Sequence, residues 1–167
     1  MSLVDVLLSR RSIRRYEQRE ISRDVLDKIL EAGRQAPSAG NKQPWHFIVV
    51  TDSEIKKEFS KGMFNRFIKD APVCIVGCAH RDIVAGKWSV VSTTIALENM
   101  VIAAWALGIG SCWIGDFSEE KVKKLLSIPA SWNVVALLSF GHPAEKPQPK
   151  KKKTIKEIAS FNRFREG

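Results

Sequence analysis

A dense cluster of hydrogen-bond donors near the start of the chain is the first feature that could support chemistry. Residues 10–15 carry four guanidinium groups and one hydroxyl, from Arg10, Arg11, Ser12, Arg14 and Arg15. A guanidinium group presents several N–H donors in a rigid fork, which suits a phosphate or the polar edge of a ring. This segment therefore predicts an anion-binding site, with a solvated basic surface as the alternative interpretation.

The chain as a whole is basic, with 27 Lys and Arg residues, 18 Asp and Glu residues and a net charge of +9. Such a charge could attract a nucleic acid. The cations concentrate in residues 10–19 and 146–156, and neither stretch has the spaced aromatic side chains of a single-strand-binding surface. Because a phosphate on a small molecule explains both stretches equally well, we expect no nucleic-acid partner.

No set of side chains has the pattern of a catalytic nucleophile with its base. The sequence lacks G-x-S-x-G, H-E-x-x-H and the P-loop, and its three histidines, His46, His80 and His142, stand at predicted strand edges or turns. They are too scattered for a zinc site, and no C-x-x-C pair exists. We therefore expect neither a catalytic side chain nor a metal.

The cysteines indicate the compartment. Cys74, Cys78 and Cys112 stand in apolar surroundings, so we interpret them as buried small hydrophobic residues in a reducing environment. The first residues lack the pattern of a signal peptide, and no apolar span approaches the length needed to cross a bilayer. We expect a soluble cytoplasmic protein with no membrane partner, and 167 residues fit one domain.

Hydrophobic periodicity and capping residues predict the elements that must hold these segments. Ser22, Ser53 and Ser118 are expected to cap helices, and capping boxes begin at Ser2 and Thr154. The expected helices cover residues 2–10, 22–36, 53–59, 64–68, 88–107, a stretch after 118 and a short one after 154. The expected strands cover residues 45–51, 73–79, the run after Gly110 and 133–140. This mixed order indicates an α+β or α/β protein with one small sheet.

The longest predicted helix, residues 88–107, is apolar on nearly every side. Such a helix must be buried, either at the centre of the domain or against a second copy of the chain. We favour a dimer core, because a domain of 167 residues has difficulty enclosing a helix of this length alone.

Two polar or glycine-rich segments lie next to predicted strands. Residues 37–44 contain turn formers without periodicity and lead directly into the strand at Trp45. The run 108–115 contains Gly108-x-Gly110, which invites a dinucleotide-binding interpretation. However, Trp113 replaces the third glycine, and the glycines follow a helix and precede a strand, the reverse of the Rossmann order. The sequence therefore argues against NAD held in a Rossmann fold.

Taken together in their order, these segments resemble the nitroreductase family of FMN-dependent oxidoreductases. Residues 10–16 match its R-R-S-x-R-x-Y/F segment, and residues 37–45 match its P-S-x-x-N-x-Q-P-W loop. The resemblance continues through A-L-E-N-M at residues 96–100, L-G-I-G-S-C-W-I-G at residues 107–115 and G-H-P at residues 141–143. It covers essentially the entire chain.

The resemblance implies the fold and the assembly. We expect an α+β, nitroreductase-like fold with a small mixed, mostly antiparallel sheet surrounded by helices. Residues 1–167 would form a single FMN-binding domain, with residues 142–167 as a C-terminal basic arm. Two chains would form an intertwined homodimer that holds two FMN molecules between the subunits.

The resemblance also assigns the basic cluster to the cofactor. Arg10, Arg11 and Ser12 match residues that hold the phosphate and ribityl groups of FMN. Arg14 matches a residue beside the N1/O2 edge of the ring, where a cation stabilises the negative charge that develops on reduction.

Residues from other segments complete the implied site. Pro37, Ser38 and Asn41 match loop positions that reach the flavin from the partner subunit. Ile114 and Gly115 match the pair whose backbone amides face N5 and O4 of the ring.

Three further residues match the family pattern in a loose register or beside an alignment gap, and two features depart from the pattern. Asn65 matches a ring-edge asparagine, and Lys150 and Lys152 match basic residues that complete the phosphate site. Ser92 stands where many members have an acidic residue, and the segment between residues 79 and 88 is short. The substrate range therefore cannot be transferred from the family.

The implied activity is a ping-pong transfer of hydride from NAD(P)H to flavin N5 and then to an electron-poor acceptor, such as a nitroaromatic compound or a quinone. The cofactor carries this chemistry, which agrees with the absence of a nucleophile and base pattern. Two alternatives remain at this stage. One is a specialised flavin reaction on the same fold, reductive dehalogenation or flavin fragmentation, and the other is a non-enzymatic basic protein that binds nucleic acid.

Overall fold

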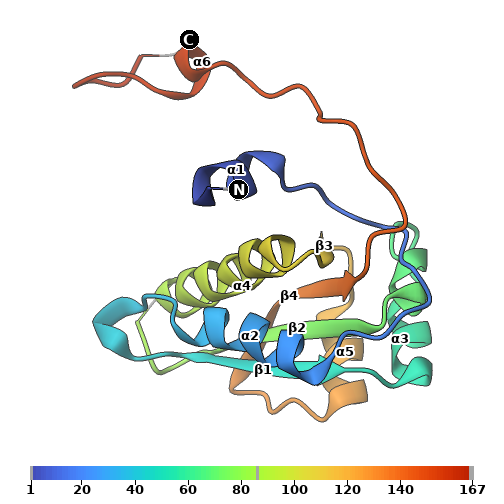
Figure 1. Ribbon diagram of the computed structural model, residues 1–167. Coiled ribbons are helices and arrows are strands. Elements are labelled where there is room, and N and C mark those ends of the chain that lie inside the picture. Colours follow the sequence, from blue (N-terminus) through green and yellow to red (C-terminus); the bar gives the residue numbers. More distant parts are fainter. Residues whose placement is uncertain (1, 86, 166–167) are drawn as a thin grey trace.

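The computed structural model describes residues 2–85 and 87–165. Figure 1 shows a central sheet with helices around it and with both ends of the chain away from the sheet. The helices are α1 (Leu3–Ser9), α2 (Arg23–Arg34), α3 (Ser53–Phe59), α4 (Trp88–Ala106), α5 (Glu119–Leu126) and α6 (Ile155–Ile158), with 3-10 turns η1 (Ala39–Asn41) and η2 (Arg66–Asp70). The strands are β1 (Trp45–Val50), β2 (Val73–His80), β3 (Gly110–Ile114) and β4 (Trp132–Gly141).

The four strands form one sheet in the order β1-β2-β4-β3, and every neighbouring pair is antiparallel. The sheet is therefore antiparallel throughout the described chain rather than mixed. A single isolated parallel bridge, between Ser12 and Ser111, adds the arginine segment to its β3 edge. The register between β2 and β4 shifts between Gly77 and Cys78, at a bulge.

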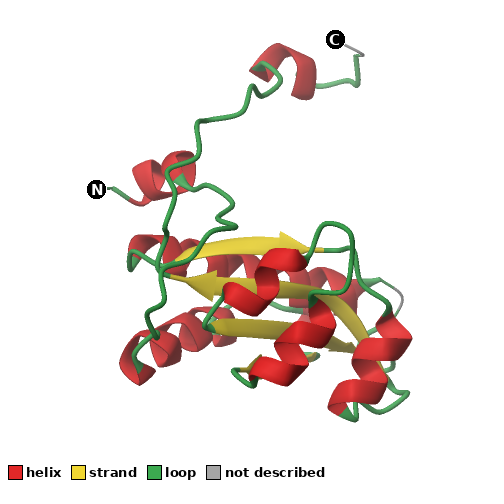
Figure 2. Ribbon diagram, turned by 90° about the vertical axis from the view of Figure 1, so that its right-hand side faces the viewer, coloured by secondary structure: helices red, strands yellow, loops and turns green. Residues whose placement is uncertain are grey.

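Helices cover both faces of the sheet, as the red helices on either side of the yellow strands show in Figure 2. Val73 and Ile75 of β2 point to a core shared with α2 and α4. Cys74 and Val76, their neighbours in sequence, point to a second core shared with α3, η2 and α5. Because β2 is buried on both faces, its sequence is continuously apolar instead of alternating.

Helix α4 is partly buried within its own chain. Eight of its residues are buried, and it packs against α2 and the sheet. By length and apolar composition it is the one helix in the described ranges that could cross a bilayer, so the expectation that no apolar span approaches this length was wrong. The buried helices of core regions pass the same test. The outer face of α4 leaves Trp88, Val90 and Ile95 exposed. The expected burial is confirmed, and a partly uncovered apolar face remains.

The end of α4 turns the chain sharply into β3. Gly108 adopts φ 78°, the left-handed conformation that glycine tolerates best. The N–H groups of Gly108 and Ile109 donate to the carbonyls of Trp105 and Ala104, at 3.1 and 2.8 Å. This is the pattern of a Schellman cap. Gly108 therefore has a structural role in stopping the helix.

Two helix predictions need correction. The cap of α3 is Asp52, whose side chain accepts from the N–H groups of Glu54 and Ile55, so the prediction of Ser53 as the cap was wrong. The helix expected over residues 64–68 is a 3-10 turn that starts two residues later, at Arg66. The other expected helices and strands are confirmed to within about two residues, and the three cysteines are free and buried.

Candidate functional site

The arginine segment lies along the β3 edge of the sheet. The N–H of Ile13 donates to the carbonyl of Ser111 at 2.9 Å, next to the bridge between Ser12 and Ser111. Ile13 is fully buried, directly over Gly110, where a Cβ atom would lie only 2.6 Å from Ile13 Cγ1. The absence of a side chain at Gly110 therefore allows this segment to approach β3.

Tyr16 fixes the other end of the segment from inside the protein. Its buried hydroxyl donates to the carbonyl of Ile13 at 2.6 Å and shares a hydrogen bond of 2.7 Å with the hydroxyl of Ser139. Burial raises the pKa of Tyr16 well above its usual value, so the phenol stays protonated at neutral pH. Ile13 and Tyr16 thus point inward, and Arg14 and Arg15 between them are exposed.

Glu145 holds the same segment from the outside. Its Oε1 atom accepts from the backbone N–H groups of Arg14 and Arg15, at 2.6 and 3.1 Å. The N–H of Ala144 donates to the carbonyl of Arg15 at 2.9 Å. The first residues of the basic arm are therefore pinned to the arginine segment. Sequence reasoning missed Glu145, because no local pattern reports a contact across 130 residues.

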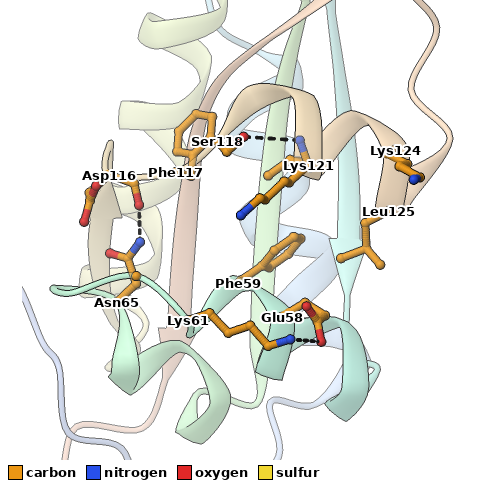
Figure 3. A pocket seen from close by; sticks show the side chains of 12 residues that line it. Glu58, Phe59, Lys61, Asn65, Asp116, Phe117, Ser118, Lys121, Lys124 and Leu125 are labelled. Atoms are coloured by element: carbon orange, nitrogen blue, oxygen red, sulfur yellow. Dashed lines mark hydrogen bonds and ion pairs between the residues drawn. The ribbon is translucent and has the colours of Figure 1, made fainter.

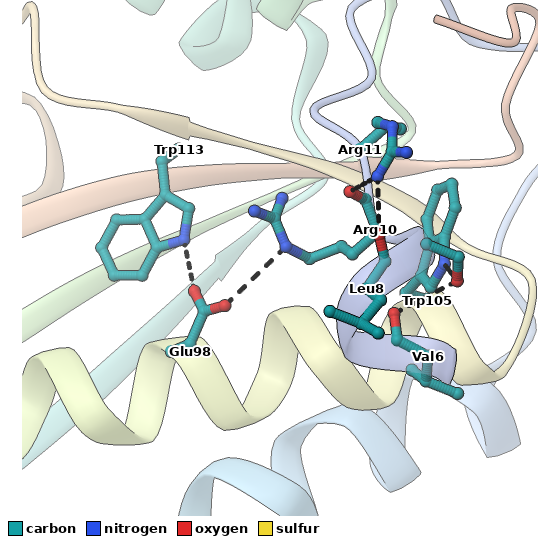
Figure 4. A network of polar contacts seen from close by, with 8 residues as sticks. Val6, Leu8, Arg10, Arg11, Glu98, Trp105 and Trp113 are labelled. Carbon is teal, nitrogen blue, oxygen red and sulfur yellow. Dashed lines mark hydrogen bonds and ion pairs between the residues drawn. The ribbon is translucent and has the colours of Figure 1, made fainter. Parts of the chain in front are cut away.

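Glu98 links Arg10 to the strand β3. Figure 4 shows its carboxylate rising from α4 between Trp113 and Arg10. Its Oε2 atom accepts from the indole Nε1 of Trp113 at 2.9 Å, and its Oε1 atom lies 3.8 Å from Nε of Arg10. On the far side of Arg10, Trp105 of α4 donates to the hydroxyl of Ser9 at 3.0 Å and so holds the end of α1. The sequence placed Glu98 in the motif of residues 96–100 but gave it no role.

Asn65 lies beside the end of β3. It is buried, and its side-chain amide donates to the backbone carbonyl of Asp116, the residue after Gly115. Ile114 is buried, whereas Gly115 is exposed and has open space where a side chain would be. A cavity of about 660 Å³ between α3 and α5 adjoins this contact, with Asn65 and Asp116 joined on one side of it (Figure 3). The side-chain position of Gly115 is thus open, and the cavity begins at the next residue, Asp116.

The loop that contains Pro37, Ser38 and Asn41 is a tight structure near the first turns of α4. The hydroxyl of Ser38 accepts from the N–H of Gln43 at 2.9 Å, and its carbonyl accepts from the N–H of Asn41 at 2.9 Å. Asn41 has φ 55°, in the left-handed region that asparagine tolerates better than most residues. The N–H of Ala39 donates to the hydroxyl of Ser92 at 3.4 Å. A hydroxyl thus supports this loop where many family members have an acidic side chain.

The loop and the arginine segment occupy different stretches of α4. Ser92 supports the loop, and Trp105, thirteen positions later, holds Ser9. At 1.5 Å per residue these positions are about 20 Å apart along the helix. In one chain, therefore, the structure gathers Arg10, Ser12, Arg14, Asn65, Ile114 and Gly115 around β3, and it places Pro37, Ser38 and Asn41 elsewhere. The guanidinium group of Arg11 instead turns back and donates to the carbonyls of Leu8 and Arg10, at 3.0 and 2.8 Å.

The lysines predicted for the phosphate have no hydrogen bond or ion pair with the arginine segment among the described residues. Lys150 and Lys152 are exposed on the extended arm, which leads away from the sheet and past α1 in Figures 1 and 2. Four apolar side chains on the same arm are also exposed, namely Ile155, Ile158, Phe161 and Phe164. The arm therefore has both basic and apolar side chains that nothing in its own subunit covers.

Cys112 lies in β3, beside the arginine segment, and its thiol is unreactive as a nucleophile because it is protonated. Burial raises the pKa of its thiol, although Arg14, the side chain of Ser12 and Arg10 each act in the opposite direction. The thiol therefore stays protonated at neutral pH. Within the described ranges, no group of three or more His, Cys, Asp or Glu side chains could hold a metal ion.

Comparison with known proteins places this arrangement in a family. The sequence model of the nitroreductase family matches residues 7–69 and 60–142, which is most of the chain. The chain is 40% identical over 147 residues to a protein of Archaeoglobus fulgidus and 36% identical over 154 residues to one of Methanothermobacter thermautotrophicus, both named NADH dehydrogenase/NAD(P)H nitroreductase. These matches cover 84% and 88% of this chain and 84% and 80% of the two relatives.

The fold agrees with this comparison. An FMN-dependent nitroreductase from Clostridium difficile superposes with a TM-score of 0.87 at 31% identity, over 96% of this chain and 99% of that one. The expected nitroreductase-like fold is thus confirmed. The chain belongs to the nitroreductase family.

Proposed function

We propose that the chain is an FMN-dependent NAD(P)H oxidoreductase whose cofactor lies along the arginine segment and β3. The observation that carries this proposal is the pairing of Ile13 with Ser111. It brings the cations of residues 10–14 alongside the strand that leads to Gly115. This edge of the sheet thus has cations at one end and the exposed Gly115 at the other.

The donors fit the chemistry of FMN. This cofactor has a phosphate dianion, a hydroxylated ribityl chain and a flat ring with polar edges, so its site needs cations, small polar groups and backbone amides in different places. In this proposal Arg10, Arg11 and Ser12 bind the phosphate and ribityl groups, and Arg14 lies at the N1/O2 edge. The phosphate site is completed by Lys150 and Lys152 of the arm.

When bound, FMN supplies the redox chemistry by taking hydride at N5 and passing it on. The residues of the chain orient it. The backbone amides of Ile114 and Gly115 would donate to the N5/O4 edge, and Asn65 would hold the neighbouring ring edge. Arg14 would offset the negative charge that develops at N1/O2. No side chain is assigned as an acid or a base, because the flavin would carry the redox chemistry.

We propose further that two chains form a homodimer with the cofactor between them. Pro37, Ser38 and Asn41 would then approach the arginine segment from the second subunit. Three uncovered apolar surfaces support this assembly: α1, the outer face of α4 and the arm. Apolar area of this extent, on separate parts of the chain, is typical of a surface that another chain covers. Each chain would be a single cofactor-binding domain of the cytoplasm, with residues 142–167 as its arm.

The test of this function is the colour and redox behaviour of the purified protein. We expect yellow protein that is bleached by NADH or NADPH without oxygen and regains its colour when a quinone or nitroaromatic acceptor is added. A halogenated aromatic acceptor that alone restores the colour would instead favour the specialised dehalogenation reaction. Colourless protein that refuses added FMN and binds DNA with a steep salt dependence would contradict the proposal.

Replacing Arg14 by alanine is expected to make bound FMN harder to reduce. The guanidinium group of Arg14 lies 6.0 Å above the ring of Phe67 and is exposed, so its loss should leave the fold intact. Loss of a cation beside N1 should lower the reduction potential by on the order of 30 mV, which is about 1.4 kcal/mol for a two-electron couple. The measurement is a spectrophotometric titration with a dye of known potential.

Arg15→Ala is the matched control, because Arg15 is the exposed neighbour of Arg14 and has no assigned place on the ring. We expect its bound FMN to keep the wild-type potential. Equal potentials in the wild type and in Arg14→Ala would show that Arg14 is not beside the N1 edge.

A further inference from the structure

We propose that Glu98 is a positioning residue of the FMN site, which sets the orientation of Arg10 and of the end of β3 at the same time. This inference rests on the proposed function. It concerns a residue of α4 that would act through two other residues and not by touching the reacting atoms.

The composition of α4 is the first argument. Glu98 is the only charged residue among the 19 residues of this helix, whose other residues are apolar or uncharged and polar. Its side chain is 41% exposed, so the carboxylate is only partly desolvated and is oriented by its partners. Its two oxygens have separate partners, Oε2 the indole N–H of Trp113 at 2.9 Å and Oε1 the Nε of Arg10 at 3.8 Å.

The positions of these partners are the second argument. Trp113 directly precedes Ile114 and Gly115, the pair whose amides are assigned to the N5/O4 edge. The indole of Trp113 packs against the core that the sheet shares with α2 and α4, and its N–H donates to Glu98. These two contacts restrain the end of β3. A change at Glu98 should therefore be felt by the backbone two residues further on.

The orientation of Arg10 is the third argument. In Figure 4 its Nε faces Glu98, and its terminal nitrogens point away from α4. A guanidinium group attracted to a carboxylate on its Nε side keeps its outer pair of donors available for an anion. The ion pair with Glu98 thus favours one direction from which Arg10 presents those donors, and one carboxylate contacts both ends of the site.

Two substitutions separate these effects. In Glu98→Gln the amide oxygen can still accept from Trp113, but the charge that attracts Arg10 is lost. In Glu98→Leu, a change of similar size that suits an apolar helix, both partners are lost. Glu54→Gln is the matched control, since it removes the same charge from an exposed ion pair with Lys57 on α3.

The first measurement uses the protein without FMN. We expect the indole ¹H–¹⁵N NMR signal of Trp113, assigned with Trp113→Phe, to move upfield in Glu98→Leu and to stay near its wild-type position in Glu98→Gln. An unmoved Trp113 signal in Glu98→Leu would overturn the link to β3, whether or not the protein binds FMN.

The second measurement is the Kd for FMN and for riboflavin, by quenching of flavin fluorescence. We expect Glu98→Leu to weaken both ligands by about tenfold, because the hydrogen bond from Trp113 to a charged group is lost. Glu98→Gln should weaken FMN more than riboflavin, since only FMN has the phosphate that Arg10 binds. Glu54→Gln should match the wild type.

The two measurements distinguish a failure of the proposed function from a failure of the role proposed for Glu98. If the wild type binds no flavin, the proposed function fails, and the NMR result still tests the contact with Trp113. If the wild type binds FMN and both Glu98 variants bind it equally well or more tightly, the carboxylate does not position Arg10 and the inference is overturned.

Discussion

Removal of residues 147–167 is expected to give a folded monomer that no longer retains FMN. The two cores of the domain, and the contacts of Glu145 with the arginine segment, all lie before the deleted residues. The fold should therefore persist. The predicted losses are the second subunit and the cofactor, measured by sedimentation velocity and by the flavin absorbance that remains after gel filtration.

The arm is the reason for this expectation. Ile155, Ile158, Phe161 and Phe164 are 73%, 64%, 88% and 89% exposed. Helix α6 has only four residues, far too few to be stable alone in water, although a capping box of Thr154 and Glu157 starts it. Each such side chain gains about 1.5–3 kcal/mol when it is fully buried. In the proposed homodimer, the second subunit would cover these four apolar side chains of the arm.

Paired substitutions separate the apolar and the basic roles of the arm. Phe161→Ser with Phe164→Ser should weaken the dimer, because apolar burial is lost while the charge is kept. Lys150→Ala with Lys152→Ala should keep the dimer and weaken FMN. A truncated protein that stays dimeric and yellow would contradict the role of the arm. Full-length protein that is monomeric but binds anionic vesicles through the arm would contradict the dimer itself.

The sequence predicted the elements well, because hydrophobic periodicity and capping residues act locally. The exceptions are also local in origin. Asp52 and Ser53 are adjacent, and aspartate and serine are both common helix caps. Only the structure shows that the Asp52 carboxylate is the cap and accepts from two N–H groups. Met63 and Phe64 look like core positions of a helix, yet both are largely exposed. Their apolar character placed the predicted helix two residues too early.

The candidate site could be predicted only in part, since its residues are held by long-range contacts. Resemblance supplied Arg10, Ser12 and Arg14, because these residues share one short motif. It could not supply Glu145 or Glu98. Their carboxylates act on backbone or side-chain groups from distant segments. Glu98 stands in the motif of residues 96–100, but the motif does not show which groups its carboxylate contacts. Such residues become visible only when the fold brings the segments together.

The structure explains why glycine stands at both positions of the motif Gly108-x-Gly110. The sequence argued against a Rossmann fold but left both glycines unexplained. In the structure, Gly108 ends α4 in a left-handed conformation and has open space around it. Gly110 has ordinary backbone angles, but the side chain of Ile13 occupies the space that a Cβ atom would need. The two glycines therefore meet different requirements, one of conformation and one of packing.

Replacing Gly110 by alanine is accordingly expected to damage both stability and FMN binding. The new Cβ would lie 2.6 Å from Cγ1 and 2.8 Å from Cβ of Ile13, closer than carbon atoms can approach. Because Ile13 is fully buried with Tyr16 and Ala71, the arginine segment must move away from β3. Overpacking of this kind costs about 1–3 kcal/mol. We expect a Tm lower by about 2–10 °C and a Kd for FMN raised by about tenfold or more.

Gly108→Ala is the control that separates the two effects. It forces alanine into a left-handed conformation, which costs about 1–2 kcal/mol, but the new methyl group meets no other atom within 4 Å. Its Tm should fall while its Kd for FMN stays at the wild-type value. If Gly110→Ala behaved like Gly108→Ala, with lower stability and unchanged FMN affinity, the position of the arginine segment would not depend on its approach to β3. The proposed site would then lose its main structural support, because the pairing of Ile13 with Ser111 is what aligns the cations with the strand.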